Sequence, residues 1–172
     1  MKKQSAGLLL YKRKGEDIEV LLVHPGGPFW AKKDAGAWSI PKGEFEDGEE
    51  PLEAARREFA EELGSPAPQG EWVSLGEAKQ SGGKVVHAWA LESDFDASHI
   101  SSNTITIDWP PRSGKQVEIP EVDKAAWVAL VDARAKIVKG QILLLEALAN
   151  HIGQVMPEIP VQGEGTAQTS LF

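Results

Sequence analysis

Two short apolar runs, Ala6–Tyr11 and Ile18–Val23, stand near the start of the chain on either side of the polar, turn-like stretch "KRKGED". Apolar runs of this length separated by turn residues predict a β-hairpin. The following stretch, His24–Ala37, is rich in Gly and Pro and predicts a loop. Trp38–Ile40 then predicts a short strand that enters a second Gly-rich loop.

Two later segments have the composition and the period of helices. Pro51 suits the first turn of a helix, where its missing N–H costs nothing, and strong helix formers fill Leu52–Leu63 before Gly64 ends the run. In Gly140–His151 the apolar residues recur at the spacing of a buried helical face, which predicts a second helix. The remaining strands are predicted at Trp72–Gln80, Lys84–Glu92, Thr104–Trp109 and Ala125–Leu130.

The order of these elements is strands, helix, strands, helix, with strands in the majority. Such an order predicts an α/β (α+β) domain in which helices cover the faces of a mixed β-sheet. We expect a single domain over residues 1–156, because a chain of 172 residues fits one domain and shows no internal repeat. Residues 157–172 lack any period and are predicted to form a flexible tail.

Composition and charge narrow the range of functions. The net charge of −8 argues against DNA or another nucleic-acid polymer as partner, because such binding depends on Lys and Arg, but it allows a small phosphorylated substrate. The absence of Cys excludes disulfides, zinc–thiolate sites and Cys nucleophiles. The apolar run after the basic start "MKK" is too short for a signal peptide or a membrane span. We therefore expect a cytoplasmic protein with no membrane partner.

Three acids gather on the first predicted helix, in the stretch "REFAEELG". Glu58, Glu61 and Glu62 stand at i, i+3 and i+4, where neighbouring like charges cost roughly 0.2–0.5 kcal/mol per pair. They lie about a quarter-turn from the core-facing stripe that includes Phe59. Two interpretations are open at this point: a solvated acidic face, or a site for a hard cation such as Mg²⁺ or Mn²⁺, which prefers oxygen ligands.

The surrounding segment, "GEFEDGEEPLEAARREFAEELGS", resembles the signature of the Nudix hydrolase family. That signature consists of a Gly, five residues, a Glu, seven residues, the run Arg-Glu-apolar-any-Glu-Glu-any-Gly, and a final apolar position. The matching positions are Gly43, Glu49, Arg57, Glu58, Phe59, Glu61, Glu62 and Gly64. Ser65, at the final apolar position, is the one departure; because it follows the helix, it concerns local packing and not the chemistry.

The resemblance implies a layered α/β/α fold and the hydrolysis of a nucleoside diphosphate linked to another group, by attack of water on phosphorus. It implies Mg²⁺ or Mn²⁺ as cofactor, held by Glu58, Glu61 and Glu62 with the backbone carbonyl of Gly43. Arg57 would bridge the carboxylates and fix their side-chain conformations. Glu49 would act through water or at the helix N-terminus, where an acid also simply suits the helix dipole.

Family members often add an acid from a later loop, as a metal ligand or as the general base, six positions before an aromatic residue of the following strand. Counting back from Trp127 gives Glu121, which is therefore the predicted later acid. Glu118 is the competing residue. If neither takes part, both are ordinary loop acids.

The substrate has to be inferred from residues outside the signature. The run Pro-Lys-Gly places Lys42 directly before Gly43 and resembles the branch that cleaves dinucleoside polyphosphates such as diadenosine tetraphosphate, with Lys42 as a phosphate ligand. Other candidates for phosphate contacts, each of which a solvated surface role would also explain, are His24, Lys32, Lys33, Arg112 and Lys115.

Aromatic residues are candidates for stacking on a nucleobase. Trp30, on a Gly-flanked loop, is the better candidate, whereas Trp38 in a strand belongs in the core, and Trp109 is a further possibility. His87 and His99 show no metal-ligand pattern and are predicted to be structural.

The sequence leaves several alternatives to a dinucleoside polyphosphate as substrate. They are a damaged or free nucleoside triphosphate, a nucleotide sugar, a capped RNA end, and a diphosphoinositol. A non-catalytic nucleotide-sensing domain is a further alternative, but it predicts loss of the acids, and every charged position of the signature is present. In each case the expected partner is a small phosphorylated nucleotide or a related anion.

Overall fold

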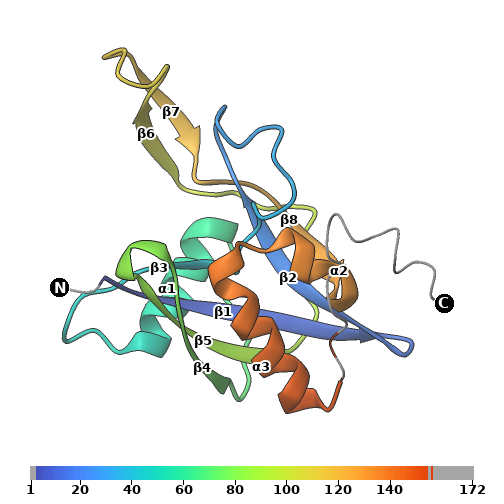
Figure 1. The fold of residues 1–172 in the computed structure, drawn as a ribbon. Coiled ribbons are helices and arrows are strands. Elements are labelled where there is room, and N and C mark those ends of the chain that lie inside the picture. Colours follow the sequence, from blue (N-terminus) through green and yellow to red (C-terminus); the bar gives the residue numbers. More distant parts are fainter. Residues whose placement is uncertain (1–2, 155, 157–172) are drawn as a thin grey trace.

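A mixed β-sheet of six strands forms the middle layer of the fold (Figure 1). The structure, a computed structural model, describes residues 3–154 and 156. The strand order is β4-β5-β1-β2-β8, with β3 paired to β1; β1 and β5 are parallel and the other pairs antiparallel. The strands are β1 Gln4–Lys14, β2 Asp17–Pro25, β3 Lys42–Glu44, β4 Val73–Lys79, β5 Val85–Glu92 and β8 Val122–Ala129. The predicted mixed sheet, and the hairpin of its first two strands, are confirmed.

Helices cover both faces of this sheet (Figure 1). In the central strand β1, Leu8 and Leu10 belong to the core cluster that contains Phe59 of the first helix, whereas Leu9 belongs to the cluster that contains Leu145 of the last helix. Successive side chains of a strand point to opposite faces, so one continuous apolar run fills both cores. The predicted α/β/α arrangement is confirmed. The α-helices of the described residues are α1 Pro51–Leu63, α2 Leu130–Lys136 and α3 Ile142–Ile152.

The helix boundaries follow local chemistry. Pro51 stands in the first turn of α1, and the helix ends at Gly64, whose φ of 77° is left-handed and whose N–H donates to the carbonyl of Ala60 at 2.8 Å. The second predicted helix begins slightly late, because Lys139–Gln141 form a 3₁₀ turn before α3. The sequence does not predict α2, which is too short to show an amphipathic period.

A separate two-stranded sheet projects from the body of the protein (Figure 1). It consists of β6, Thr104–Asp108, and β7, Gln116–Pro120. The prediction of a strand at Thr104–Trp109 is confirmed by β6, but the interpretation of Glu118 as a loop acid is wrong, because this residue lies in β7.

Two shorter features also differ from the prediction. Strand β3 lies where a loop was expected, and its backbone pairs with Ser5–Gly7 of β1. Trp38–Ile40 forms only isolated bridges to its neighbours instead of a strand. Such pairing depends on tertiary contact, since three residues carry no readable period.

The predicted tail, residues 157–172, lies outside the described residues, and the single domain over residues 1–156 stays a prediction. No helix in the described part of the chain has both the length and the apolar composition that crossing a bilayer requires.

Candidate active site

The three acids of α1 differ in their exposure to solvent. Glu58 and Glu62 are only 9% and 5% exposed, beside the buried Ala54 and Ala55. The side chain of Glu61 is 43% exposed. A solvated acidic face is therefore the wrong interpretation for two of the three acids. Carboxylates are rarely buried unless something compensates their charge.

Arg57 joins the acids on one side. Its guanidinium donates to Glu58 Oε2 at 2.7 Å and to Glu61 Oε2 at 3.2 Å, and also donates to both carboxylate oxygens of Glu49 at 3.1 and 3.2 Å. These bonds raise the pKa of Arg57, with the Glu49 contact as the largest cause, and keep it charged. One oxygen each of Glu58 and Glu61 is left outside this network of bonds to Arg57.

Burial makes the two inner acids unusually basic. Desolvation is the main cause of the raised pKa of Glu58, with a smaller contribution from the charge of Glu61 that offsets part of the effect of Arg57. Desolvation and the nearby charge of Glu121 raise the pKa of Glu62 to about 8, although Lys42 opposes the shift. Two carboxylates in this environment favour the approach of a cation or a proton.

Strand β3 passes directly over α1. The backbone N–H of Lys42 donates to Glu62 Oε1 at 3.3 Å. A Cβ added at Gly43 would collide with the carboxylate of Glu58, so a larger residue here requires that side chain or the strand to move. Glycine therefore allows the close approach of the backbone to the acids.

Glu121, at the junction of β7 and β8, faces the same group of acids. Its charge acts on both Glu58 and Glu62. Glu121 lines one hollow together with Glu58 and Glu61, and an adjoining cleft together with Glu62. Glu118 is exposed on β7 and lines neither of these two cavities beside the acids. The structure brings the predicted later acid to the cluster and leaves its competitor outside.

Two adjoining cavities lie beside the acids. A hollow of about 390 Å³ is lined by Gly43, Glu58 and Glu61. A cleft of about 460 Å³ is mainly apolar and includes Trp30, the predicted stacking residue, which is half-buried. The two cavities share Lys42, Gln80 and Glu121, so an occupant could have an anionic part at the acids and an apolar part in the cleft.

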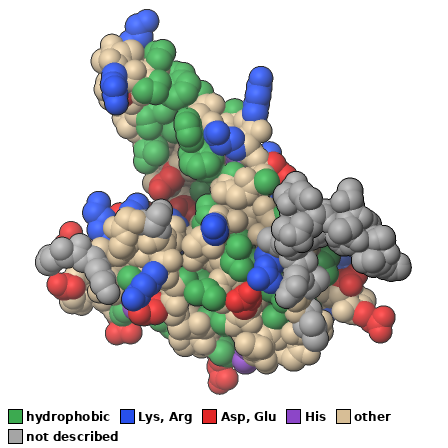
Figure 2. Space-filling view, in the orientation of Figure 1, with side chains coloured by type: hydrophobic (Ala, Val, Ile, Leu, Met, Phe, Trp, Pro, Cys, Tyr) green, Lys and Arg blue, Asp and Glu red, His purple; other side chains and the backbone are tan. Residues whose placement is uncertain are grey.

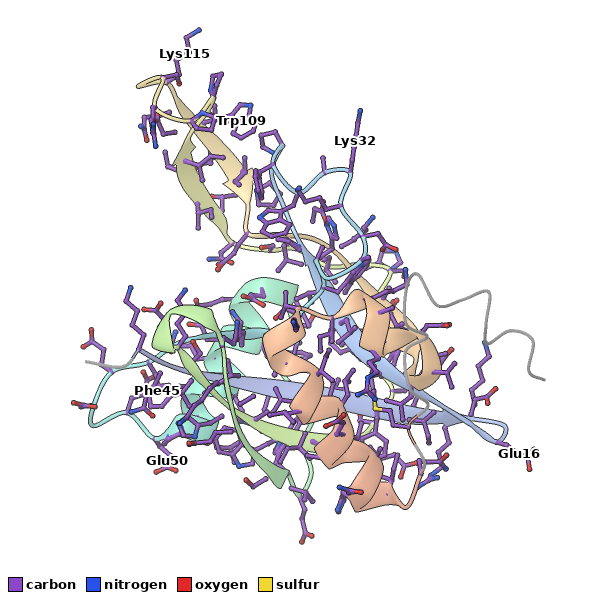
Figure 3. The ribbon with its side chains drawn as sticks, in the orientation of Figure 1. Glu16, Lys32, Phe45, Glu50, Trp109 and Lys115 are labelled. Carbon is purple, nitrogen blue, oxygen red and sulfur yellow. The ribbon has the colours of Figure 1, made fainter. Side chains whose placement is uncertain are left out.

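The structure does not bring the other cationic candidates to the acids. Lys32 and Lys115 are exposed, and Figure 3 shows them at the outer ends of the β2–β3 loop and of the β6–β7 hairpin, with Trp109 near Lys115. Arg112 lies in the turn of the same hairpin, with a positive φ of 63°. Lys33 Nζ lies 4.8 Å from the ring centroid of Phe29, beside the apolar cleft.

His24 is not a phosphate ligand in this structure, which corrects the prediction. It is 1% exposed, and both ring nitrogens are occupied, Nδ1 by Asp123 at 2.9 Å and Nε2 by the carbonyl of Lys33 at 2.6 Å. Its ring also packs edge-on against Trp38, which is in the core as expected. His24 therefore fixes the β2–β3 loop to β8.

His87 and His99 make contacts of the structural kind expected for them. His87 bonds to Gln4 at 2.7 Å, and His99 bonds to Asp96 at 3.2 Å on an exposed loop. Neither residue lines the acidic hollow.

The donor set suits a hard divalent cation, because it consists of carboxylates, and two of them, Glu58 and Glu62, are buried with raised pKa values. Within residues 3–154 and 156, no three His, Cys, Asp or Glu side chains already converge as ligands of one metal ion. Arg57 occupies one oxygen each of Glu58 and Glu61. The residues that would hold the ion are Glu58, Glu61, Glu62 and Glu121, with the carbonyl of Gly43.

The structure adds residues that the sequence analysis passes over. Gln141 is fully buried, accepts from the backbone N–H of Ile40 at 3.0 Å, and lines the apolar cleft beside Gln80. Ile105 and Ile119 line the same cleft from the hairpin. The alternation in "TITID" and "QVEIP" is a readable signal for such a wall, whereas nothing in the sequence singles out Gln141.

Comparison with known proteins is consistent with this geometry. The chain is 34% identical to the RNA pyrophosphohydrolase of Helicobacter pylori over 64 residues, covering 33% of this chain and 41% of that protein. It thus spans about two fifths of the length of this curated relative.

Two solved structures have a similar fold. The Ap4A hydrolase of C. elegans, in a binary complex, gives a TM-score of 0.60 at 21% identity, covering 88% of this chain and 98% of that one. The NUDIX domain of Shewanella oneidensis NrtR, complexed with ADP ribose, gives 0.58 at 18% identity, covering 88% and 89%. Residues 1–148 match the family described as the NUDIX domain, and because this match covers most of the chain, the protein belongs to the Nudix hydrolase family, as the acid-rich segment predicted.

Proposed function

We propose that this protein is a Mg²⁺- or Mn²⁺-dependent pyrophosphohydrolase that cleaves a nucleoside diphosphate linked to another group, with a dinucleoside polyphosphate as its substrate. One observation carries the proposal: the buried Glu58 lines an acidic hollow, the buried Glu62 lines the adjoining apolar cleft, and Glu121 lines both. The pair of cavities suits a substrate with a charged phosphate chain and an uncharged ring.

The acids, Arg57 and Lys42 have separate roles in the proposed hydrolysis. Glu58, Glu61, Glu62 and Glu121 would hold the metal ion. When bound, it would supply positive charge to the phosphates and activate water. Arg57 keeps the carboxylates of Glu49, Glu58 and Glu61 oriented through its four bonds. Lys42 neutralises phosphate charge next to the acids.

The preference for a long polyphosphate rests on Lys42 and on Lys33. A dinucleoside polyphosphate carries more charge than a nucleotide sugar, so it gains more from Lys42 in the hollow and Lys33 beside the cleft. We expect dinucleoside polyphosphates of four or more phosphates to exceed nucleotide sugars by at least about tenfold in kcat/KM. That ratio corresponds to about 1.4 kcal/mol of transition-state stabilisation, which one charge-assisted hydrogen bond supplies.

The test is a panel of phosphorylated substrates hydrolysed in ¹⁸O-labelled water. The products are resolved by chromatography, and the label shows which phosphorus the water attacks. We expect diadenosine tetraphosphate to be cut asymmetrically to ATP and AMP, since the acids lie on one side of the cleft. Selective hydrolysis of nucleotide sugars, or of a single modified nucleoside triphosphate to its monophosphate, would contradict the proposed substrate.

A phosphorylated RNA end is the second candidate. It is favoured by the 34% identity over 64 residues with an RNA pyrophosphohydrolase, whereas the net charge of −8 disfavours a long nucleic acid. A short capped oligoribonucleotide and a 5′-triphosphorylated one belong in the same panel. Turnover of either at a higher kcat/KM than diadenosine tetraphosphate would promote this candidate.

A further inference from the structure

The β6–β7 hairpin has an apolar face that the body of the protein leaves partly uncovered. Its cross-strand pairs include Ile105 with Ile119 and Ile107 with Val117. Directly opposed residues of an antiparallel pair lie on the same face, as do residues two apart, so all four side chains share one face. Ile105 is 40% exposed and Val117 is 37% exposed. A contiguous apolar face of this kind marks a binding surface.

This face forms one wall of the 460 Å³ cleft, through Ile105, Ile107 and Ile119. Phe29 and Trp30 of the β2–β3 loop line the same cleft as an edge-on pair with ring centroids 5.0 Å apart. Figure 2 shows hydrophobic side chains along the hairpin, with acidic side chains below them. The volume is within the range of about 300–1,000 Å³ that is typical of sites for small ligands.

Backbone hydrogen bonds join both walls to α1. The N–H of Asn103 donates to the carbonyl of Glu61 at 2.9 Å, and the N–H of Glu121 donates to the carbonyl of Asn103 at 2.9 Å. The N–H of Gly26, in the loop that carries Phe29, donates to the carbonyl of Glu121 at 3.1 Å. The cleft therefore stands in a fixed relation to the acids, with the backbone of Glu121 in the connecting ladder.

The lining of the cleft is mainly apolar and offers few polar groups to an occupant. Lys42 and Glu121 lie where it meets the acidic hollow. At the lining, the amide of Gln141 accepts from the N–H of Ile40 at 3.0 Å and donates to Ser39 Oγ at 3.0 Å, and so is occupied within the protein. An occupant with a flat ring and an attached anionic chain fits this distribution of apolar and charged side chains.

We propose that the inner face of the hairpin and the Phe29–Trp30 pair bind the nucleobase of the substrate by its faces, so that the hairpin sets the requirement for a base without distinguishing strongly between bases. Stacking tolerates any base because every base has a π-face. This inference rests on the proposed function for the identity of the ligand as a nucleotide. It assigns binding of the base, whichever base it is, to Ile105, Ile107, Ile119, Phe29 and Trp30.

Binding of non-hydrolysable ligands tests the inference without turnover. In isothermal titration with Mg²⁺, we expect the double variant Ile105→Ser/Ile107→Ser to raise the Kd of α,β-methylene-ADP about tenfold. The Kd of methylenediphosphonate, which has no base, should stay within about twofold. The matched control is Thr106→Ser, which lies on the polar face of the same strand opposite Glu118 and should change neither Kd.

Two further measurements complete the test. α,β-Methylene diphosphates of adenosine, guanosine, cytidine and uridine should bind the unaltered protein within about fivefold of one another. Phe29→Ala changes a side chain that is 54% exposed on the other wall, so it probes the cleft even if the hairpin variant does not fold. It should also weaken binding of the nucleotide and not of methylenediphosphonate.

Several outcomes would overturn the inference. They are an unchanged nucleotide Kd in both variants, an equal loss for the two ligands, or a strong preference for one base. A dimer in sedimentation that the hairpin variant dissociates would assign the apolar face to a second copy of the chain. Tighter binding of the nucleotides than of methylenediphosphonate, without hydrolysis of any pyrophosphate, would instead contradict the proposed function and leave the inference standing.

Discussion

At the scale of single residues, the buried acids of α1 should matter more for activity than its exposed acids. Glu58→Gln and Glu62→Gln keep size and polarity but remove the charge that would hold a cation, so each should lower kcat/KM by at least about 100-fold. The fold should survive, as judged by circular dichroism. Glu53→Gln, an exposed position on the same helix, is the matched control and should keep nearly full activity. Near-full activity of Glu62→Gln would show that the metal assignment is wrong.

The later acid belongs to the same ranking. Glu121→Gln should cost clearly more activity than Glu118→Gln, because only Glu121 lines the hollow that contains the acids. The two residues are three positions apart, and Glu118 lies on the polar face of the hairpin. The reverse order would show that the later acid has been placed wrongly.

At the scale of elements, the sequence predicts what local chemistry determines. The apolar run of β1, the Pro51 start and the Gly64 end of α1 can be read from residue types. Strand β3 cannot, because it exists only through pairing with β1. The apolar cleft lies between the hairpin and the β2–β3 loop, so its position is set by tertiary contacts. The burial of His24 also could not be predicted from its loop sequence.

The close approach of β3 to α1 predicts that a larger residue at Gly43 lowers both stability and activity. In Gly43→Ala the new methyl group would collide with the carboxylate of Glu58, so that carboxylate or the strand must move. Overpacking of this kind costs about 1–3 kcal/mol, and a displaced Glu58 should lower kcat/KM more than tenfold. Thermal melting and initial rates measure both effects. Glu46→Ala, at an exposed position just beyond β3, is the control. Equal melting temperature and activity in Gly43→Ala and the unaltered protein would contradict the close approach.

At the scale of the whole molecule, the acids oppose folding as long as no cation is bound. The pKa of Glu62 is raised to about 8 in the folded protein from a model-peptide value of 4.5. A raised pKa contributes stability that is fully present below the unfolded value and is lost as pH rises through the folded value. The metal-free protein should therefore lose stability between about pH 4.5 and pH 8 because of this residue.

A divalent cation should reverse that loss, since it binds the gathered carboxylates of the folded state and not the dispersed acids of the unfolded chain. Mg²⁺ at 100 times its Kd stabilises a protein by about 2.7 kcal/mol, which at about 2–4 °C per kcal/mol for a chain of this size raises the Tm by about 5–10 °C. The rise should be larger at pH 8 than at pH 5.5, because protons compete for Glu62 at the lower pH.

In the Glu58→Gln/Glu62→Gln variant the metal-free Tm should fall less between these two pH values, and Mg²⁺ should no longer raise it. Differential scanning calorimetry with chelator and with millimolar Mg²⁺ measures all four conditions; identical melting temperatures with and without Mg²⁺ at pH 8 would rule out a metal site formed by these acids.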